Sequence, residues 1–299
     1  MNLNANYIVL YPLSFEEFLY NVDKNIFNKL SAVKDIYQID PSLNKTLFKY
    51  LYEYIIIGGM PSVVNNYIEN GFVFENIRAE QNRIVDKLLS SLAVYYKKTE
   101  YKNIESILKI ILPLLIRNNN KFKINDFGKS RRFSSFSKFI DITKKLHLVY
   151  TSYNIKEKST EINNSSFNLY LFDTGLLGAF GNIPYSIYGD NLDLGNQFVL
   201  GLVKNYAATE SFSSFILPIY NWSQNMSKVE LFFINKNKKS LGIEIKNNKS
   251  GKLKSLDILH EVYPEAKLIR MNNSYPMDKG QIKVLPLYTI RSIIRNFSN

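Results

Sequence analysis

Two glutamates and a lysine in the last third of the chain have the types and spacing for metal-assisted chemistry. Glu244 and Lys246 stand two residues apart in one apolar run, and Glu230 lies in the run before it. Residues i and i+2 of a strand share a face, so Glu244 and Lys246 should project together, with Glu230 across a hairpin. Two carboxylates and an ammonium on one face could hold Mg²⁺ and orient a water for phosphodiester cleavage. A Glu–Lys pair on an exposed sheet face is the alternative.

A second motif, Gly128-Lys129-Ser130, matches only the end of a phosphate-binding loop. The leading glycine of such a loop would fall at position 123, which is Lys123. Without that glycine the backbone N–H groups cannot wrap around phosphates. We therefore expect no nucleotide hydrolysis by this chain alone.

The composition narrows the chemistry further. Lysine and arginine total 38 against 26 acidic residues, which gives a formal net charge of +12. The excess of positive charge favours an anionic partner, DNA or RNA first, although a solvated basic surface would have the same composition. There is no cysteine and there are two histidines, so disulfides, thiol nucleophiles, cysteine-ligated zinc and histidine-rich metal sites are excluded.

Nothing in the sequence indicates a membrane or export segment. The longest strongly apolar run, Ile110–Ile116, contains Pro113 and is far shorter than the roughly 20 residues that span a bilayer. Residues 1–20 lack a basic segment ahead of an apolar run, so we expect no signal peptide and a cytoplasmic protein.

The elements that must position these residues begin with a helical region. Tyr7–Tyr11 reads as a short strand stopped by Pro12, and Ser14 three residues before Glu17 predicts a capping box that opens a helix. Apolar spacing then predicts helices over 42–100, interrupted at Gly58–Ser62.

Residues 101–155 follow the order of a winged helix-turn-helix. An apolar helix, a polar turn, a short segment Phe122–Phe127, a helix Phe133–Leu146 and a strand Leu148–Tyr153 succeed one another. Six basic residues lie on or beside the would-be recognition helix and are the predicted nucleic-acid contacts: Lys129, Arg131, Arg132, Lys138, Lys144 and Lys145.

The last third alternates strands and helices. We expect strands at 167–172, 215–220, 229–235, 240–246, 266–271 and 282–286, and helices at 193–208 and 254–263. The predicted fold class is therefore α/β and multi-domain. The predicted domains are a helical region (1–100), a winged helix (101–160) and an α/β domain (161–299).

Three stretches resemble a prokaryotic AAA-type ATPase family that carries a DUF4143 domain: Tyr11-Pro12-Leu13-Ser14-Phe15-Glu16-Glu17-Phe18, Gly58-Gly59-Met60-Pro61 and Leu171-Phe172-Asp173-Thr174-Gly175-Leu176-Leu177. The family's restriction-endonuclease-like terminal region is similar to the segments around Glu230 and Glu244. The resemblance implies that the ATPase core with its Walker motifs is missing, as in a truncated or split family member. It also implies a degenerate nuclease site, because Asn196 stands where the family has a glutamate and Glu230 where it has an aspartate.

Three functions follow as expectations. The first is a non-catalytic module that binds nucleic acid or protein. The second is a Mg²⁺-dependent nuclease that uses Glu230, Glu244 and Lys246, with Glu230 and Glu244 as metal ligands and Glu210 as a substitute for the missing carboxylate. The third is a regulatory partner of a separate ATPase subunit.

Overall fold

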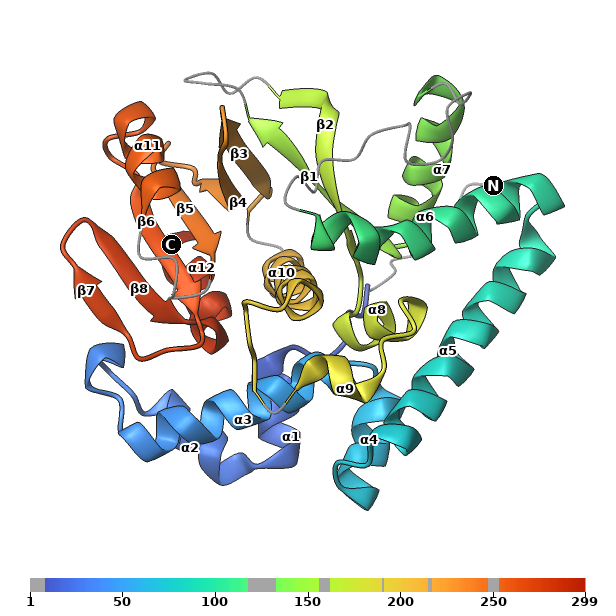
Figure 1. The fold of residues 1–299 in the computed structure, drawn as a ribbon, viewed down its shortest axis with the longest axis horizontal. Helices are drawn as coiled ribbons and strands as arrows, with labels where there is room; N and C mark the ends of the chain where they lie inside the picture. Colours follow the sequence, from blue (N-terminus) through green and yellow to red (C-terminus); the bar gives the residue numbers. More distant parts are fainter. Residues whose placement is uncertain are drawn as a thin grey trace.

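An eight-stranded mixed sheet runs through the computed structural model (Figure 1). The structure describes residues 9–117, 133–155, 162–189, 191–214, 217–246 and 253–298. Its strand order is β2-β1-β3-β4-β5-β6-β8-β7. The strands are β1 (Val149–Ile155), β2 (Ile162–Leu171), β3 (Tyr220–Gln224), β4 (Ser227–Ile234), β5 (Ser240–Ile245), β6 (Lys267–Asn272), β7 (Met277–Lys279) and β8 (Ile282–Pro286). The α/β class predicted from the sequence is confirmed.

Helices surround this sheet. The N-terminal ones are α1 (Phe15–Val22), α2 (Lys24–Ser31), α3 (Pro41–Ile57), α4 (Pro61–Asn70), α5 (Phe74–Tyr95) and α6 (Lys98–Ile116). The others are α7 (Phe133–Lys145), α8 (Thr174–Phe180), α9 (Tyr185–Tyr188), α10 (Gln197–Phe212), α11 (Lys254–Val262) and α12 (Ile290–Ser298). Short 3₁₀ helices lie at Ile36–Gln38 and Leu287–Thr289.

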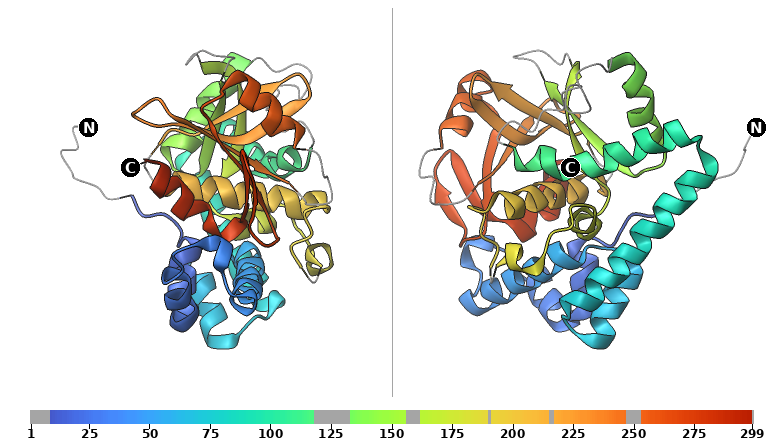
Figure 2. Two further views of the ribbon diagram at one scale, coloured as in Figure 1. Left: turned by 90° about the vertical axis from the view of Figure 1, so that its left-hand side faces the viewer. Right: turned by 45° about the vertical axis from the view of Figure 1, so that its right-hand side comes forward.

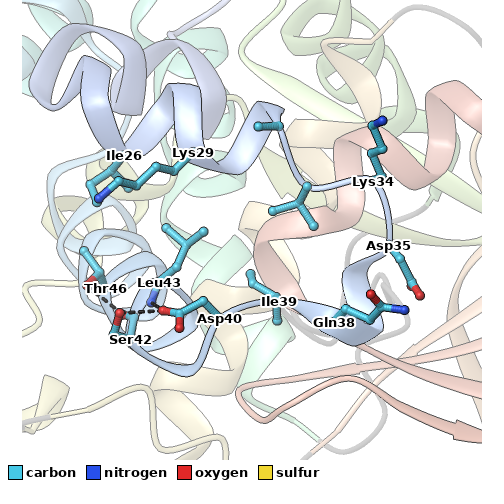
Figure 3. A pocket seen from close by; sticks show the side chains of 12 residues that line it. Ile26, Lys29, Lys34, Asp35, Gln38, Ile39, Asp40, Ser42, Leu43 and Thr46 are labelled. Atoms are coloured by element: carbon cyan, nitrogen blue, oxygen red, sulfur yellow. Dashed lines mark hydrogen bonds between the residues drawn. The ribbon is translucent and has the colours of Figure 1, made fainter.

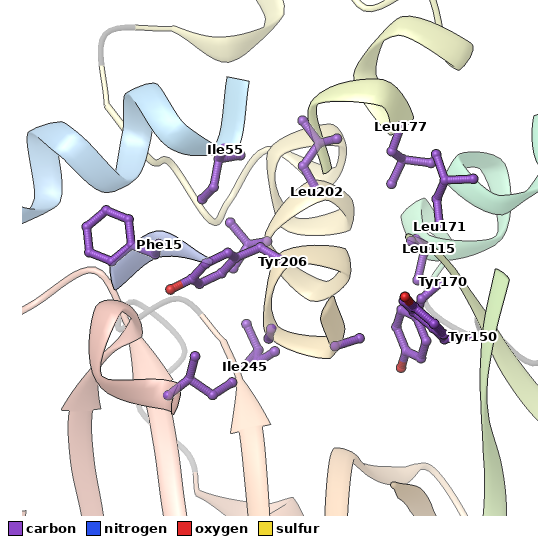
Figure 4. Packing of buried hydrophobic residues seen from close by; sticks show 14 of the residues in the cluster. Phe15, Ile55, Leu115, Tyr150, Tyr170, Leu171, Leu177, Leu202, Tyr206 and Ile245 are labelled. Atoms are coloured by element: carbon purple, nitrogen blue, oxygen red, sulfur yellow. The ribbon is translucent and has the colours of Figure 1, made fainter. Parts of the chain in front are cut away.

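Helix α10 lies at the centre of the larger hydrophobic core. Most of its residues are buried on every side, which is the pattern of a helix surrounded by other elements rather than lying on a surface. Figure 4 shows Leu202 and Tyr206 of this helix between Ile55 of α3, Leu177 of α8 and Ile245 of β5. This core extends from Phe15 to Phe297 in sequence, so it joins the first helices to the last.

A smaller core lies on the opposite face of the sheet. Leu256 and Leu259 of α11 pack there against Val229 and Phe232 of β4 and Leu268 of β6. On β5, Ile243 and Ile245 belong to the larger core, whereas a Cβ at Gly242 would meet Leu259 of α11 at 2.4 Å. Odd-numbered residues of β5 therefore face α10, and even-numbered residues face α11.

The N-terminal segment differs from the strand predicted for it. Residues 9–14 have no regular secondary structure, and positions 7 and 8 lie outside the described residues. The bond from the Leu13 N–H to the Gly59 carbonyl (2.8 Å) holds this segment against the α3–α4 turn instead. The capping box is confirmed, because Ser14 Oγ accepts from the Glu17 N–H and Glu17 Oε2 accepts from the Ser14 N–H.

Helices α1–α4 gather at one end of the molecule, and α5 and α6 form an elbow that extends from them to the region of α7 (Figure 2). Helix α7 and strand β1 form where the would-be recognition helix and the strand after it were predicted. The segment 118–132, which would supply the second helix of a winged helix, lies outside the described residues. Strand β1 pairs antiparallel with β2 and parallel with β3, so it belongs to the continuous sheet.

The predicted domain limits stay predictions. The limit at 160 falls between β1 and β2, which pair from Val149↔Leu171 to Ile155↔Ile162. Two strand positions need correction. Strand β3 begins at Tyr220, where a strand was predicted to end, and the three-residue strand β7 was not predicted.

Candidate functional site

Glu244 and Lys246 lie side by side, as their spacing predicted. Lys246 Nζ lies 2.8 Å from Glu244 Oε1. Arg270 approaches the other oxygen of the same carboxylate, with its Nη2 at 2.7 Å and its Nε at 3.0 Å from Glu244 Oε2. Glu244 and Arg270 are register partners on the parallel strands β5 and β6, and both are buried. Glu244 therefore has two cationic partners, and sequence reasoning identified only one of them.

Glu230 turns to the other face of the sheet. Tyr220 pairs with Phe232, but Trp222 pairs with Val229, so Glu230 and Leu231 together oppose one residue of β3 in a β-bulge. The bulge places Val229 and Phe232 on the α11 side and leaves Glu230 beside α10. There Lys204 Nζ of α10 lies 3.6 Å from Glu230 Oε1, and the Ile245 N–H donates to Glu230 Oε2 at 3.2 Å.

The expectation that Glu230, Glu244 and Lys246 share one face is therefore wrong for Glu230. A Mg²⁺ site needs anionic oxygens that converge on one point. Here each carboxylate already holds a buried cation, Lys204 on one face and Arg270 on the other. Within the described residues, no group of three or more acidic or histidine side chains is arranged to hold a metal ion. The residues present do not fit the magnesium site that the sequence suggested.

The other two positions of the predicted nuclease site have structural contacts. Asn196 is the N-cap of α10: its Oδ1 accepts from the Phe198 N–H at 2.9 Å, and its Nδ2 donates to the Ile187 carbonyl at 2.9 Å. Glu210 lies within α10, not beyond its end as expected. Its Oε1 accepts from the Phe15 N–H at 2.8 Å, and its Oε2 lies 3.8 Å from Arg291 Nη1. Burial raises the pKa of Glu210 to about 7.

Half of the predicted nucleic-acid contacts lie in the described part of the chain. Lys138, Lys144 and Lys145 are on α7, whereas Lys129, Arg131, Arg132 and the Gly128-Lys129-Ser130 motif fall outside the described residues. Lys138 and Lys145 are seven residues apart, which is close to two turns, so they share one stripe of the helix. Phe139, Ile140 and Thr143 form the buried face of α7.

The α7 lysines have only loose acidic neighbours among the described residues. Lys138 Nζ lies 3.8 Å from Glu100, and its side chain is 60% exposed. Lys144 Nζ lies 4.0 Å from Asp141 and donates to Tyr153 Oη at 3.0 Å. Lys145 is exposed. These cations stay available to a solution partner, unlike Lys204 and Arg270.

A buried junction brings together the three stretches on which the family resemblance rested. Asp173 accepts from the Gly59 N–H at 2.7 Å and from the Leu176 N–H at 2.8 Å, as N-cap of α8. The Gly59 carbonyl accepts from Leu13. Burial raises the pKa of Asp173 to about 6 against the effect of these N–H donors. Both oxygens of this carboxylate accept from backbone N–H groups. Asp173 therefore joins the start of α8 to the α3–α4 turn.

A cavity of about 650 Å³ lies between α2 and the start of α3 (Figure 3). Its lining mixes apolar side chains such as Ile39 and Leu43 with Lys29, Lys34 and Asp40. Asp40 caps α3 through the Leu43 N–H at 2.9 Å, so it is occupied locally. The three predicted catalytic residues lie elsewhere.

A second cavity, of about 460 Å³, lies beside α7. Three aromatic side chains contribute to its lining, together with Leu217, Pro218 and Ile219 and with the basic residues Lys144 and His147. Sequence reasoning missed this cavity, because its walls come from segments that are far apart in the chain.

Comparison with known proteins changes the family assignment. The profile of a family described as "Domain of unknown function (DUF8612)" matches residues 48–186, from α3 to α9. The assignment to the AAA-type ATPase family with a DUF4143 domain is therefore wrong. The prediction of a truncated or split ATPase, which depended on that assignment, is wrong as well. Neither the curated proteins nor the solved structures contain a match to this chain. Within its described part, no helix is both long and apolar enough to cross a membrane. The chain is thus similar, over just under half its length, to a family whose function is not described.

Proposed function

We propose that this chain is a non-catalytic nucleic-acid-binding module that contacts DNA or RNA through α7. The observation that carries the proposal is the stripe of Lys138 and Lys145, with Lys144 beside it. The ion-pair distances are long: Lys138 Nζ lies 3.8 Å from Glu100, and Lys144 Nζ lies 4.0 Å from Asp141. Three more basic residues precede α7 in the sequence, and the whole chain carries a formal charge of +12. A basic stripe on an outer helix is the usual contact to phosphates.

The non-catalytic part of the proposal rests on Glu230 and Glu244. Arg270 and Lys204 neutralise these carboxylates on opposite faces of the sheet. A nuclease would need both to bind one metal ion near one phosphate. Here each carboxylate is instead the partner of a buried cation.

Salt dependence of binding tests the proposal. Fluorescence anisotropy with labelled single-stranded and duplex DNA and RNA, between 50 and 200 mM salt, should give an affinity that falls steeply through counterion release. Lys138→Glu/Lys145→Glu should weaken binding at least tenfold at low salt and reduce the salt slope by about 2.

Lys236→Glu/Lys239→Glu is the matched control. It changes the net charge by the same amount in the exposed β4–β5 turn, and it should weaken binding much less. Equal losses in the two double variants would mean that only net charge matters, and an affinity independent of salt would remove the proposal. Cleavage of any probe in Mg²⁺ that is lost in Glu244→Ala would overturn the non-catalytic part.

A further inference from the structure

Three aromatic rings from distant parts of the chain form one stack beside α7. Tyr150 of β1 lies between Tyr11 and Phe212, the last residue of α10. The ring centroids of Tyr150 and Tyr11 are 6.1 Å apart with planes 24° from parallel, and those of Tyr150 and Phe212 are 4.6 Å apart at 22°. Tyr150 is buried, whereas Tyr11 and Phe212 are half-buried. We call these three residues the aromatic ledge.

The three ledge residues line the 460 Å³ cavity together with Leu217, Pro218 and Ile219. This volume lies within the range of about 300–1,000 Å³ that small-molecule sites occupy. Aromatic and aliphatic side chains are the surfaces on which a planar ring gains most from burial.

Lys144 and His147 also line the cavity. The Lys144 side chain is one-third exposed, and His147 is exposed in the turn that joins α7 to β1. The turn has the hydrogen bonds of a Schellman motif: the His147 N–H donates to the Lys144 carbonyl and the Leu148 N–H to the Thr143 carbonyl. His147 occupies its left-handed position, at φ 56°. Because of this turn only three residues separate α7 from β1, and the cavity is lined by Lys144, which lies next to Lys145 of the basic stripe in the sequence.

We propose that this cavity binds one nucleobase of a single-stranded DNA or RNA segment. The base stacks on the aromatic ledge, and the phosphate of the same nucleotide lies against Lys144 and His147. This inference rests on the proposed function, because it takes α7 as the surface that contacts the backbone. In a duplex both faces of a base are covered by its neighbours, so the cavity selects single strands. Stacking on aromatic side chains tolerates any base, which predicts little sequence preference.

A matched set of variants tests the site with the full chain. Tyr11→Ser removes one outer ring, and Tyr11→Phe keeps it. Tyr11→Ser should weaken binding of a single-stranded oligonucleotide about tenfold and leave duplex binding unchanged, whereas Tyr11→Phe should bind as the wild type does. Tyr275→Ser, which removes a 42% exposed tyrosine from a loop, is the control and should have no effect.

Two direct readouts separate this site from the proposed function. An oligonucleotide with one 5-iodouracil should crosslink on irradiation to Tyr11 or Phe212, located by mass spectrometry. Saturation-transfer NMR with UMP and AMP should detect binding of the base without a polynucleotide, and Tyr11→Ser should abolish it. Thermal unfolding of each variant checks that the fold is intact.

The outcomes are distinguishable. If oligonucleotides bind through Lys138 and Lys145, but Tyr11→Ser is neutral and no crosslink reaches the ledge, the base site is overturned and the proposed function stands. If mononucleotides bind but polynucleotide binding does not depend on Lys138 and Lys145, the site stands and α7 is not the backbone contact. If neither nucleotides nor oligonucleotides bind, or if an aromatic peptide occupies the cavity in preference to UMP, the inference is wrong.

Discussion

Arg270 and Glu244 face each other across two parallel strands, with Nη2 and Oε2 2.7 Å apart and with 3% and 0% of their side-chain surfaces exposed. The pair lies on the α11 side of the sheet, next to an otherwise apolar core. Desolvation of two charges at such a site is offset only while both are present. We therefore expect the loss of either Arg270 or Glu244 alone to destabilise the fold more than the loss of both.

Removing one partner tests this dependence. Arg270→Met should lower the free energy of unfolding by about 3–5 kcal/mol, because Glu244 would keep a buried charge with one cation fewer. Arg270→Met/Glu244→Met should recover much of that loss. Urea unfolding followed by the fluorescence of Trp222, the single tryptophan, measures both.

Lys246→Met is the comparison for this series. The lysine side chain is 43% exposed, so its removal should cost less than about 1 kcal/mol. Equal losses for Arg270→Met and Lys246→Met would show that burial does not distinguish the two cations.

Glu210 makes stability depend on pH. Its pKa is about 7 in the folded chain against an ordinary value of 4.5, so the folded state binds the proton more tightly. The contribution of this group is fully present below pH 4.5 and is lost as pH rises through 7. The loss over this range is roughly 3 kcal/mol, at about 1.4 kcal/mol per pH unit.

Glu210→Gln keeps an oxygen acceptor for the Phe15 N–H and cannot ionise. Urea titrations at pH 5, 6, 7 and 8 should show wild-type stability falling relative to this variant up to about pH 7, and a constant difference above it. A difference that grows in the opposite direction, or none, would contradict the assignment. Asp173, with its pKa raised to about 6, adds a similar loss at lower pH in both proteins.

The Schellman turn between α7 and β1 carries a backbone penalty. A left-handed conformation is costly for most L-residues but easier for asparagine. His147→Asn should therefore raise the free energy of unfolding by roughly 0.5–1 kcal/mol, as measured by urea titration. The same change should weaken mononucleotide binding, because it removes a basic group from the cavity.

Lys238→Asn, at φ 60° in the β4–β5 turn, should show the same stabilisation with no effect on binding. If His147→Asn lowers the free energy of unfolding, the imidazole makes a contact that stabilises the fold by more than the backbone penalty of its left-handed conformation.

Two glycines with nearly the same positive φ separate backbone strain from crowding. Gly58 has φ 77° and Gly71 has φ 72°. A Cβ at Gly71 would meet nothing within 4 Å, whereas one at Gly58 would lie 2.3 Å from Asp173 Oδ1. At ψ −169° this backbone conformation is open essentially to glycine alone, so Gly71→Ala should cost about 1–3 kcal/mol without any side-chain clash.

Gly58→Ala should cost at least about 2 kcal/mol more, because it displaces a buried carboxylate from its backbone donors. Urea unfolding of the two variants side by side gives the difference. Similar costs would show that the α3–α4 turn can move away from Asp173.

Local signals in the sequence predicted most of the elements. The Ser14–Glu17 capping box, the strand at 282–286 and the helix near 254–262 are confirmed, because each is set by neighbouring residues. The start of β3 was wrong because the apolar run at 215–220 attracted the strand prediction, whereas the strand itself is YNWSQ, in which three of the five residues are polar.

The candidate catalytic site could be predicted only in part. The period of two placed Glu244 beside Lys246 correctly, but one extra residue at the bulge reversed the direction expected for Glu230. Arg270 gave a signal that was not used: a charged residue inside a predicted apolar strand requires a buried partner. The aromatic ledge leaves no signal in the sequence, because Tyr11, Tyr150 and Phe212 are far apart in the chain and come into contact only in the folded structure.

The contacts of α1 connect residues that are far apart in the chain. Phe15 bonds to Glu210 across 195 positions, and Arg295 bonds to Glu16 across 279. The same holds for α3, because Tyr288 Oη donates to Asn44 Oδ1 across 244 positions. Contacts with such separations form late in folding because a long loop must close first. During synthesis, the first helices therefore cannot complete their final packing until residue 295 has left the ribosome, and their apolar faces stay exposed to aggregation until then.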